Sequence, residues 1–329
     1  MPANANEQKQ KTSIGSDEAI ESLRAQAEAK RAENEALSLE DAKQLKSEQI
    51  RNEAIKSGTT LAPVPIEDLP SKGMFYPDGT RIWISAATLA DIKRWSSMDE
   101  SDMEDINDKM QDILESCCKI SFGSDSMVRG NWKDILDLDR LYLLFAIHDF
   151  SFPPGANDIR VKLDEKDDVL LKKENVKYIE FSEKLMKFYN PTKKCFSFPV
   201  KKTEAFRDTD CKMDIYLPKA GVSMWVLDYM KTCEQRRDNY DKSMIQYASL
   251  LIRDWRGLNN DAYYKLIDKT LDWSAYEWSL ISKIKDILSN AVTTPVMKYK
   301  DNGGIERETP LVFREGIKAI FQQSLDIDL

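Results

Sequence analysis

The chain has 329 residues, of which 42% are hydrophobic and 32% charged, so it is neither disordered throughout nor a disulfide-stabilised miniprotein. Its formal net charge of -8 excludes the overall basic field that nucleic-acid-binding proteins usually carry. No apolar run approaches the roughly 18 residues of a membrane-spanning helix, and the N-terminus lacks the basic and apolar blocks of a signal peptide. We therefore expect a cytosolic protein.

The N-terminal part of the sequence lacks aromatic residues, because all 31 Phe, Trp and Tyr lie at or after Phe75. Aromatic side chains contribute much of the buried area of a core, so we expect no core in about the first seventy residues. Residues 1–58 are predicted to form a disordered tail and a helical arm rich in Ala, Glu and Lys. The apolar positions of the arm keep no heptad register, which favours a solvated helix over a coiled coil. A helix that docks in a groove on a partner is the functional alternative.

A Pro-rich segment, residues 59–73, follows the arm. Pro63, Pro65 and Pro70 each fix a backbone angle and bias the preceding residue toward an extended conformation. The segment is therefore predicted to be a stiff strap that joins the arm to the body.

The next segment, residues 74–158, is predicted to be mainly helical. It opens with Pro77-Asp78-Gly79, which is typical of a tight turn between two short extended pieces. Apolar residues then recur at steps of three and four, with Asp134 and Asp137 near the start of the third helix. The predicted helices are residues 88–95, 100–118 and 134–148.

Residues 159–218 are predicted to form a β-rich module, because alternation with period two replaces the helical period. Pro199 cannot donate a backbone hydrogen bond, so its strand is expected at a sheet edge. The predicted strands are residues 159–163, 169–171, 178–181, 195–200 and 213–217.

The helical period returns in residues 219–329. Gly303-Gly304 between two short extended runs predicts a β-hairpin within this C-terminal region. The predicted helices are residues 222–238, 241–256, 260–271, 274–292 and 312–323. The predicted fold class is thus α+β, with an extended N-terminal helical arm, a mixed body with a β-rich insertion and a C-terminal helical bundle.

The single histidine limits the chemistry. With only His148 available, a His-pair metalloprotease site is impossible, and any His-dependent triad must use this residue. The adjacent Asp149 would suit a general base, but consecutive helical residues do not face each other. A histidine that interacts with the free carbonyls of a helix C-terminus is the favoured interpretation.

The cysteines lack the short paired spacing of structural zinc sites, and their odd number favours reduced thiols. We expect small buried residues, and we expect the neighbouring Cys117 and Cys118 not to face inward together on a helix. The five cysteines are Cys117, Cys118, Cys195, Cys211 and Cys233.

The remaining motifs are weak. Asp208-Thr209-Asp210 lacks the glycine and distal glutamate of a calcium loop, and the S-x-x-K match at Ser282 lacks its companion motifs. The sequence contains no glycine-rich nucleotide-binding motif. Trp255-Arg256-Gly257 could stack on nucleic acid, but interleaved aspartates favour packing aromatics with neighbouring salt bridges. We predict no catalytic, cofactor-binding or metal-binding residue and no enzymatic activity.

One stretch, Leu69–Gly79, combines two prolines, two glycines and adjacent aromatics. This composition predicts a rigid loop that presents Phe75 and Tyr76. Either the two aromatics fill the core where the chain enters the body, or they form a docking surface at low entropic cost.

The same stretch, together with two later segments, resembles the T4-type bacteriophage base plate protein family, the family of the baseplate hub assembly protein. The resemblance is firmest over Leu69–Phe152. The segments that carry it read LPSKGMFYPDGTRIWI, ILESCCKISF and LYLLFAIHDFSF.

The resemblance implies a non-enzymatic protein of phage tail morphogenesis, acting in assembly or structure of the contractile-tail baseplate hub. Its expected partners are other baseplate and tail proteins, especially hub subunits. The resemblance is compatible with an oligomer of this chain. Binding to a membrane or to nucleic acid is not expected. The expected location is the host cytoplasm during assembly or the virion tail baseplate. The alternatives are a tail assembly chaperone absent from the mature virion and a nucleic-acid-binding adaptor. The residues that match the family motif, and hence the expected partner-binding residues, are Pro70, Ser71, Lys72, Gly73, Phe75 and Tyr76.

Overall fold

Helices and antiparallel sheets make up the described part of the chain, which confirms the predicted α+β class. The predicted tail and arm, residues 1–58, lie outside the described residues, as does most of the predicted helix 312–323. The described residues all belong to one structural unit, Leu61–Leu329. The computed structural model describes residues 61–99, 101–123, 128–152, 159–162, 168–170, 176–178, 181–200, 212–237, 242–271, 273–292, 296–300, 304–310 and 320–321.

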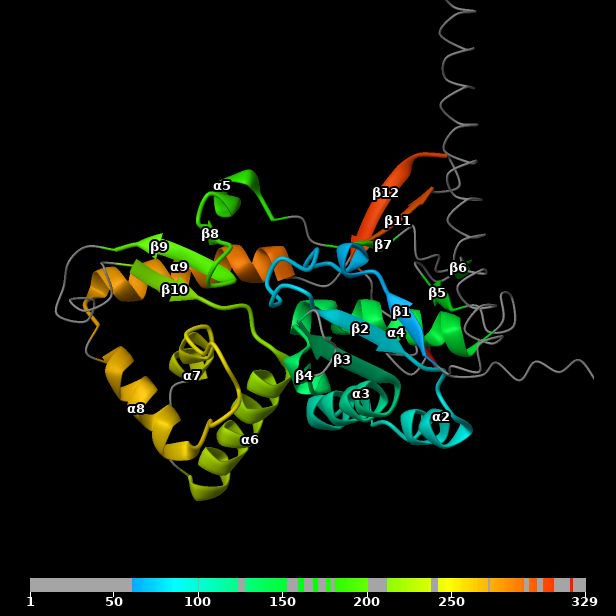
Figure 1. The fold of residues 1–329 in the computed structure, drawn as a ribbon, viewed down its shortest axis with the longest axis horizontal. Helices are drawn as coiled ribbons and strands as arrows, with labels where there is room; N and C mark the ends of the chain where they lie inside the picture. The colour runs from blue at the N-terminus through cyan, green and yellow to red at the C-terminus, as the bar shows by residue number, and fades with distance from the viewer. Residues whose placement is uncertain are drawn as a thin grey trace, which may run out of the picture. The chain divides into compact units, whose positions relative to one another are not determined.

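A four-stranded antiparallel sheet begins the body (Figure 1). Its strands, in pairing order, are β1 (Ala62–Val64), β2 (Arg81–Ile84), β3 (Cys118–Phe122) and β4 (Val128–Arg129). The edge strand β1 comes from the predicted strap, and its central Pro63 is the register partner of Trp83. An edge tolerates proline, because no outer neighbour needs the missing N–H group. The prolines therefore give the expected extended backbone, but Ala62, Val64 and Leu69 are buried, so the segment packs onto the body.

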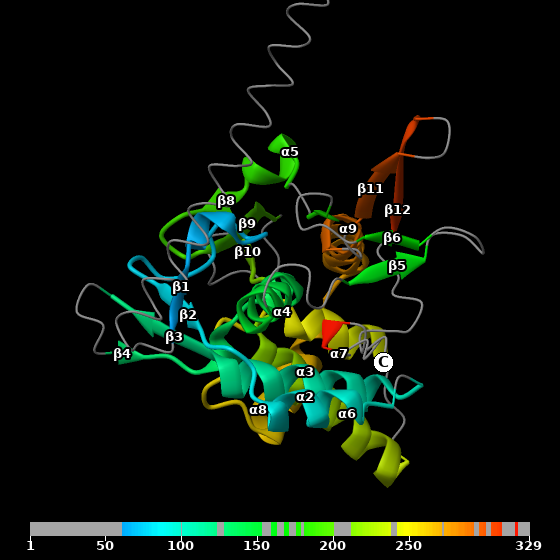
Figure 2. The same cartoon turned by 90° about the vertical axis from the view of Figure 1, so that its right-hand side faces the viewer.

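Three helices follow the order predicted from the sequence: α2 (Leu89–Ser96), α3 (Met103–Cys117) and α4 (Asp137–Ser151). Thr88 and Asp91 form a capping box that fixes the start of α2. Helix α3 packs against α2 and α4, and α4 also packs against β2 (Figures 1 and 2). These contacts give the sheet and the three helices a shared core.

The start of the third helix differs from the prediction. Asp134 ends a separate 3-10 turn, η2 (Trp132–Asp134), and α4 begins only at Asp137. The reason is a set of bonds to the segment before α6: Ala220 donates its N–H to Ile135, and Asp137 donates its N–H to Pro218. The backbone between the two helical pieces is therefore extended.

The β-rich part of the chain contributes strands to three sheets. Most lie close to the predicted positions, but β7 precedes the predicted strand 178–181. Strands β5 and β6 pair with each other, β8 to β10 form a three-stranded sheet in the order β10-β9-β8, and β7 joins the C-terminal hairpin in the order β12-β11-β7. The bounds are β5 (Arg160–Lys162), β6 (Asp168–Leu170), β7 (Val176–Lys177), β8 (Tyr189–Asn190), β9 (Cys195–Pro199), β10 (Lys212–Ile215), β11 (Val296–Lys300) and β12 (Glu306–Pro310).

The edge position predicted for the Pro199 strand is wrong, because β9 is the middle strand of its sheet. The proline is nevertheless accommodated. Strand β8 pairs with Cys195 and Phe196 only, whereas Pro199 at the far end faces Lys212 of β10. Its missing N–H group thus lies beyond the end of β8.

The described part of the C-terminal region contains four helices: α6 (Ala220–Arg236), α7 (Lys242–Ser249), α8 (Asn260–Leu271) and α9 (Ala275–Val292). A short helix, α5 (Glu183–Met186), precedes them. Tyr263 of α8 is fully buried against Trp225 and Tyr229 of α6. Helix α7 is shorter than predicted, because the carbonyl of Leu250 accepts a bond from Tyr216 and the chain turns away. No described helix is long and apolar enough to cross a membrane.

The last described residues, Ile320 and Phe321, pack into the core that the four-stranded sheet shares with α2, α3 and α4. Phe321 is fully buried, with its ring centroid 5.1 Å from that of Trp95 in α2 and 6.2 Å from that of His148 in α4. Its neighbour Ile320 is also fully buried. The region around Phe321 is therefore an integral part of the core that α2 and α4 form.

We expect Phe321→Ala to lower the free energy of unfolding by about 3 to 5 kcal/mol, because it leaves a cavity against Trp95. Ile305→Ala is the matched control, since Ile305 is 62% exposed and should change stability by less than about 0.5 kcal/mol. Urea denaturation of both variants measures the difference. Equal effects would contradict the described packing of the chain end.

Candidate functional site

The loop that follows β1 is built from consecutive tight turns. Lys72 donates its N–H to Leu69 at 2.8 Å, and Met74 donates to Ser71 at 3.2 Å. The two central residues of the second turn, Lys72 and Gly73, have φ of 53° and 71°. Two positive φ angles define a type I′ turn, in which glycine is unstrained but lysine costs about 1 kcal/mol. The loop is therefore preset, as its composition predicted.

The Phe75 side chain lies inside an aromatic cluster. Its ring centroid is 5.4 Å from that of Phe181, 5.3 Å from that of Tyr189 and 5.1 Å from that of Phe196. The hydroxyl of Tyr189 also donates a hydrogen bond to the backbone carbonyl of Met74. Such ring pairs contribute about 0.5 to 1.5 kcal/mol each beyond their buried area. The cluster therefore holds the loop against the sheet formed by β8 to β10.

The Tyr76 side chain joins the loop to α4 through a buried carboxylate. Its hydroxyl donates to Asp139 Oδ2 at 2.8 Å and accepts the N–H of Leu136 at 3.0 Å. The other carboxylate oxygen, Oδ1, accepts the N–H of Ser71 at 2.9 Å. Hydrogen bonds to a charged group contribute about 1.5 to 3 kcal/mol. Asp139 thus fixes both ends of the loop to the start of one helix.

Burial shifts the titration of both partners in this contact. It raises the pKa of Asp139 to about 6, although hydrogen bonds from Ser71 and Tyr76 act in the opposite direction. Burial, together with the Asp139 charge, raises the pKa of Tyr76 well above its usual value, so the phenol stays protonated and donates. Desolvation is therefore the dominant electrostatic effect at this site.

The loop does not offer its aromatics as a docking surface. Phe75 and Tyr76 are 4% and 1% exposed, so both rings fill the core. The expectation that these two residues bind a partner is therefore corrected. The reason is that Asp139 and the aromatic cluster satisfy both side chains internally. Of the six residues that match the family motif, Pro70, Ser71, Phe75 and Tyr76 are buried, Gly73 is half-buried and Lys72 is exposed.

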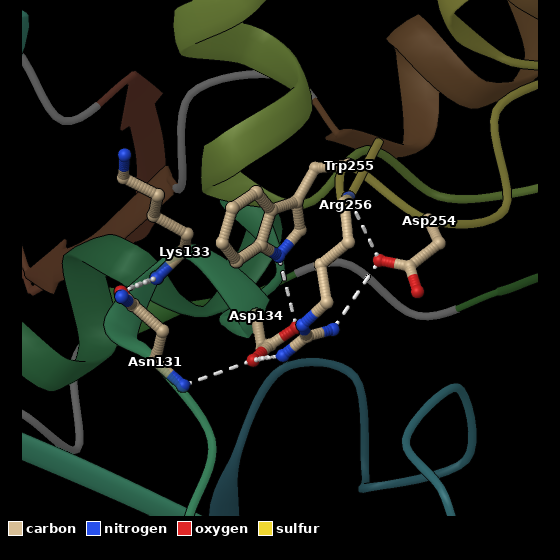
Figure 3. A network of polar contacts seen from close by, with 6 residues as sticks. All are labelled: Asn131, Lys133, Asp134, Asp254, Trp255 and Arg256. Atoms are coloured by element: carbon tan, nitrogen blue, oxygen red, sulfur yellow. Dashed lines mark hydrogen bonds and ion pairs between the residues drawn. The ribbon is translucent and has the colours of Figure 1, made fainter. Parts of the chain in front are cut away.

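A second buried carboxylate joins η2 to the loop after α7 (Figure 3). Asp134 Oδ1 accepts the indole N–H of Trp255 at 2.9 Å. Its Oδ2 accepts the N–H of Asn131 at 2.9 Å and pairs with the guanidinium of Arg256. Arg256 also bonds Asp254 at 3.2 Å. The Trp255 segment is thus a packing aromatic with neighbouring salt bridges, as predicted.

The close approach of Trp255 depends on Gly221. A Cβ atom at this position of α6 would lie 2.7 Å from Trp255 Cγ and 2.9 Å from Lys133 Cβ. Both distances are shorter than real Cβ contacts, so any larger residue forces a shift. A glycine near the start of α6 therefore allows α6, η2 and the Trp255 loop to meet.

His148 occupies the last turn of α4, as predicted, but its surroundings differ. The residue is buried, its ring lies near those of Phe152 and Phe321, and Nδ1 is 3.1 Å from Asp149 Oδ1. The expectation that the adjacent His148 and Asp149 cannot meet is wrong, because the exposed aspartate can fold back onto the ring. The backbone carbonyl of His148 accepts the N–H of Phe152 at the end of the helix.

Four cysteines are buried free thiols, and Cys211 lies outside the described residues. Cys117 and Cys118 both face inward, contrary to expectation, because α3 ends at the first and β3 begins at the second. Burial raises the pKa of both thiols to about 12. Among the described residues, no group of three or more His, Cys, Asp or Glu could hold a metal ion.

Sequence reasoning missed the roles of Asp134 and Asp139. A signal existed for Asp139, which shares the buried face of α4 with Leu143 and Ile147 at helical spacing. No local signal links Asp134 to Trp255, which lies 121 residues away. The weak calcium-loop motif, Asp208–Asp210, lies outside the described residues.

Comparisons of the chain with protein-family models, with curated proteins and with solved structures found no match.

We expect the stability difference between the protein and its Asp139→Asn variant to depend on pH. The native pKa of Asp139, about 6, lies above its ordinary value of 3.8, so the carboxyl binds its proton more tightly in the folded state. Its contribution is fully present below about pH 4 and is lost as pH rises through 6, by about 3 kcal/mol. The variant cannot titrate, so the difference, measured by urea denaturation from pH 4 to 7, should fall over this range.

The control for this pH series is Asp228→Asn, which removes an exposed carboxylate of α6. Its stability difference should vary much less between pH 4 and 7. An Asp139→Asn difference that stays flat with pH would refute the desolvated state of this carboxyl.

We expect Gly221→Ala to lower the free energy of unfolding by about 1 to 2 kcal/mol, although alanine normally favours a helix. The cost should shrink by at least about 1 kcal/mol when Trp255 is already replaced by alanine, because the clashing ring is gone. A double-mutant cycle measured by thermal unfolding tests this. Equal costs in both backgrounds would contradict the close contact.

Proposed function

We propose that this chain is a non-enzymatic assembly protein of a contractile phage tail. In this proposal it acts in the assembly or structure of the baseplate hub, by contacts with hub subunits and other tail proteins. It works in the host cytoplasm during assembly and either remains in the virion baseplate or leaves as a chaperone.

The observation that carries the proposal is the segment Leu69–Phe152, which resembles the T4-type base plate family. Its three quoted motifs form one packed region, in which the loop is bonded to α4 through Tyr76 and Asp139. The segments that resemble the family therefore pack against one another within the single unit that the described residues form.

One exposed apolar side chain lies in the same region. Leu89, the first residue of α2, is 63% exposed, which is the largest exposure of a large apolar side chain among the described residues. Single exposed apolar residues are common, so the contact needs a direct test. Apolar anchors of this kind give protein interfaces much of their binding energy.

The test is Leu89→Asp in a phage that encodes the chain. Aspartate is favourable in the first turn of a helix, so the fold should be kept while the apolar contact is lost. We expect fewer hub complexes and a lower yield of infectious particles. Leu227→Asp, at an exposed leucine of α6 outside the family-like segment, should have a much smaller effect.

Omission of the chain decides the proposal as a whole. If hubs assemble normally without it, and purified hub subunits do not bind it, the proposed function is wrong. Mass spectrometry of purified virions then separates a structural component, which is present, from a chaperone, which is absent.

A further inference from the structure

Positive side chains gather around the Asp134 network. We define the junction patch as Lys133 of η2, Lys219 at the start of α6, and Arg253 and Arg256 of the loop after α7. The isolated β-bridge between Leu136 and Lys219 brings the first two segments together. The charges of Arg253 and Arg256 act on Lys219 together with those of Asp134 and Asp254. Positive charge thus collects at this junction, although the chain as a whole is acidic, with net charge -8.

Arg256 already uses both of these carboxylates. It pairs with Asp134 and, at 3.2 Å, with Asp254. Asp134 also accepts hydrogen bonds from Trp255 and Asn131. Lys133, Lys219 and Arg253 form no ion pair with any described residue.

The patch is accessible in part. Arg253 is exposed, the Arg256 side chain is 46% exposed, and Lys133 and Lys219 are half-buried. Burial lowers the pKa of Lys219; Asp134 and Asp254 oppose this effect, and Arg256 and Arg253 add to it. A further negative group at this surface would relieve the repulsion among the cations.

The aromatic surface of the patch is occupied. Lys133 Nζ lies 5.5 Å from the centroid of the Trp255 ring, and Arg256 Cζ lies 4.9 Å from it. Figure 3 shows the ring between these two side chains. Tyr263 is fully buried. A nucleic acid would therefore find little aromatic surface for base stacking.

We propose that the junction patch binds an acidic segment of a partner protein, whose carboxylates pair with Lys133, Lys219 and Arg253. Discrete carboxylates fit arginine forks and lysine ammonium groups at short range. The inference rests on the proposed function only in taking the ligand to be a protein. It adds the chemistry of one contact, made by elements other than the helix α2 that carries Leu89.

The experiment measures binding of a fluorescently labelled polyglutamate peptide to the full-length chain by anisotropy at low salt. We expect binding that weakens as salt rises, and a loss of affinity of about tenfold or more in the double variant Lys133→Glu and Arg253→Glu. The matched control, Lys93→Glu and Arg94→Glu on the exposed side of α2, makes the same change of charge and should lose about twofold or less.

Three results would overturn the inference: no binding by the unaltered protein, equal losses in the two double variants, or single-stranded DNA that binds as tightly as polyglutamate and responds to the same variants. The milder pair Lys133→Ala and Arg253→Ala guards against misfolding, and thermal unfolding checks each variant. The assay contains no phage protein, so its failure leaves the omission experiment intact, and failure of the omission experiment leaves this one interpretable.

Discussion

Two buried carboxylates at the approach to α4 hold together segments that are far apart in the sequence. Asp139 accepts hydrogen bonds from Ser71 and Tyr76 of the loop before β2, which lie 68 and 63 residues away in the sequence. Asp134 accepts a hydrogen bond from Trp255 of the loop after α7, which lies 121 residues away. A buried charge is costly unless hydrogen bonds satisfy it, so each carboxylate makes its partners obligatory.

This constraint explains why the most distinctive loop of the sequence faces inward. Phe75 and Tyr76 sit side by side, but one enters the aromatic cluster and the other reaches Asp139. The turn that places both side chains requires a positive φ angle at Lys72, which is unfavourable for lysine. Rigidity in this loop serves the packing of two sheets and a helix, and the rings of Phe75 and Tyr76 are not available for contact with a partner.

Regular elements could be predicted from the sequence, because their signals are local. Helix α8 has the bounds that its apolar period indicates. The wrong helix bounds result from hydrogen bonds to distant residues. Helix α7 ends early because the carbonyl of Leu250 accepts the N–H of Tyr216. Helix α4 starts late because the carbonyl of Ile135 accepts the N–H of Ala220. For the candidate site, the sequence left open whether Phe75 and Tyr76 fill the core or form a docking surface. It could not decide between the two, because the burial of Tyr76 depends on Asp139, which no pattern within the loop reveals.

The burial of Phe321 has a consequence for the order in which the molecule forms. Trp95 and His148 emerge from the ribosome long before the ring that covers them. Strand β7 likewise cannot pair until its partner β11 has been synthesised, more than a hundred residues later. The core that Phe321 shares with α2 and α4 therefore cannot close until residue 321 has been made, and its apolar face stays open to chaperones until then.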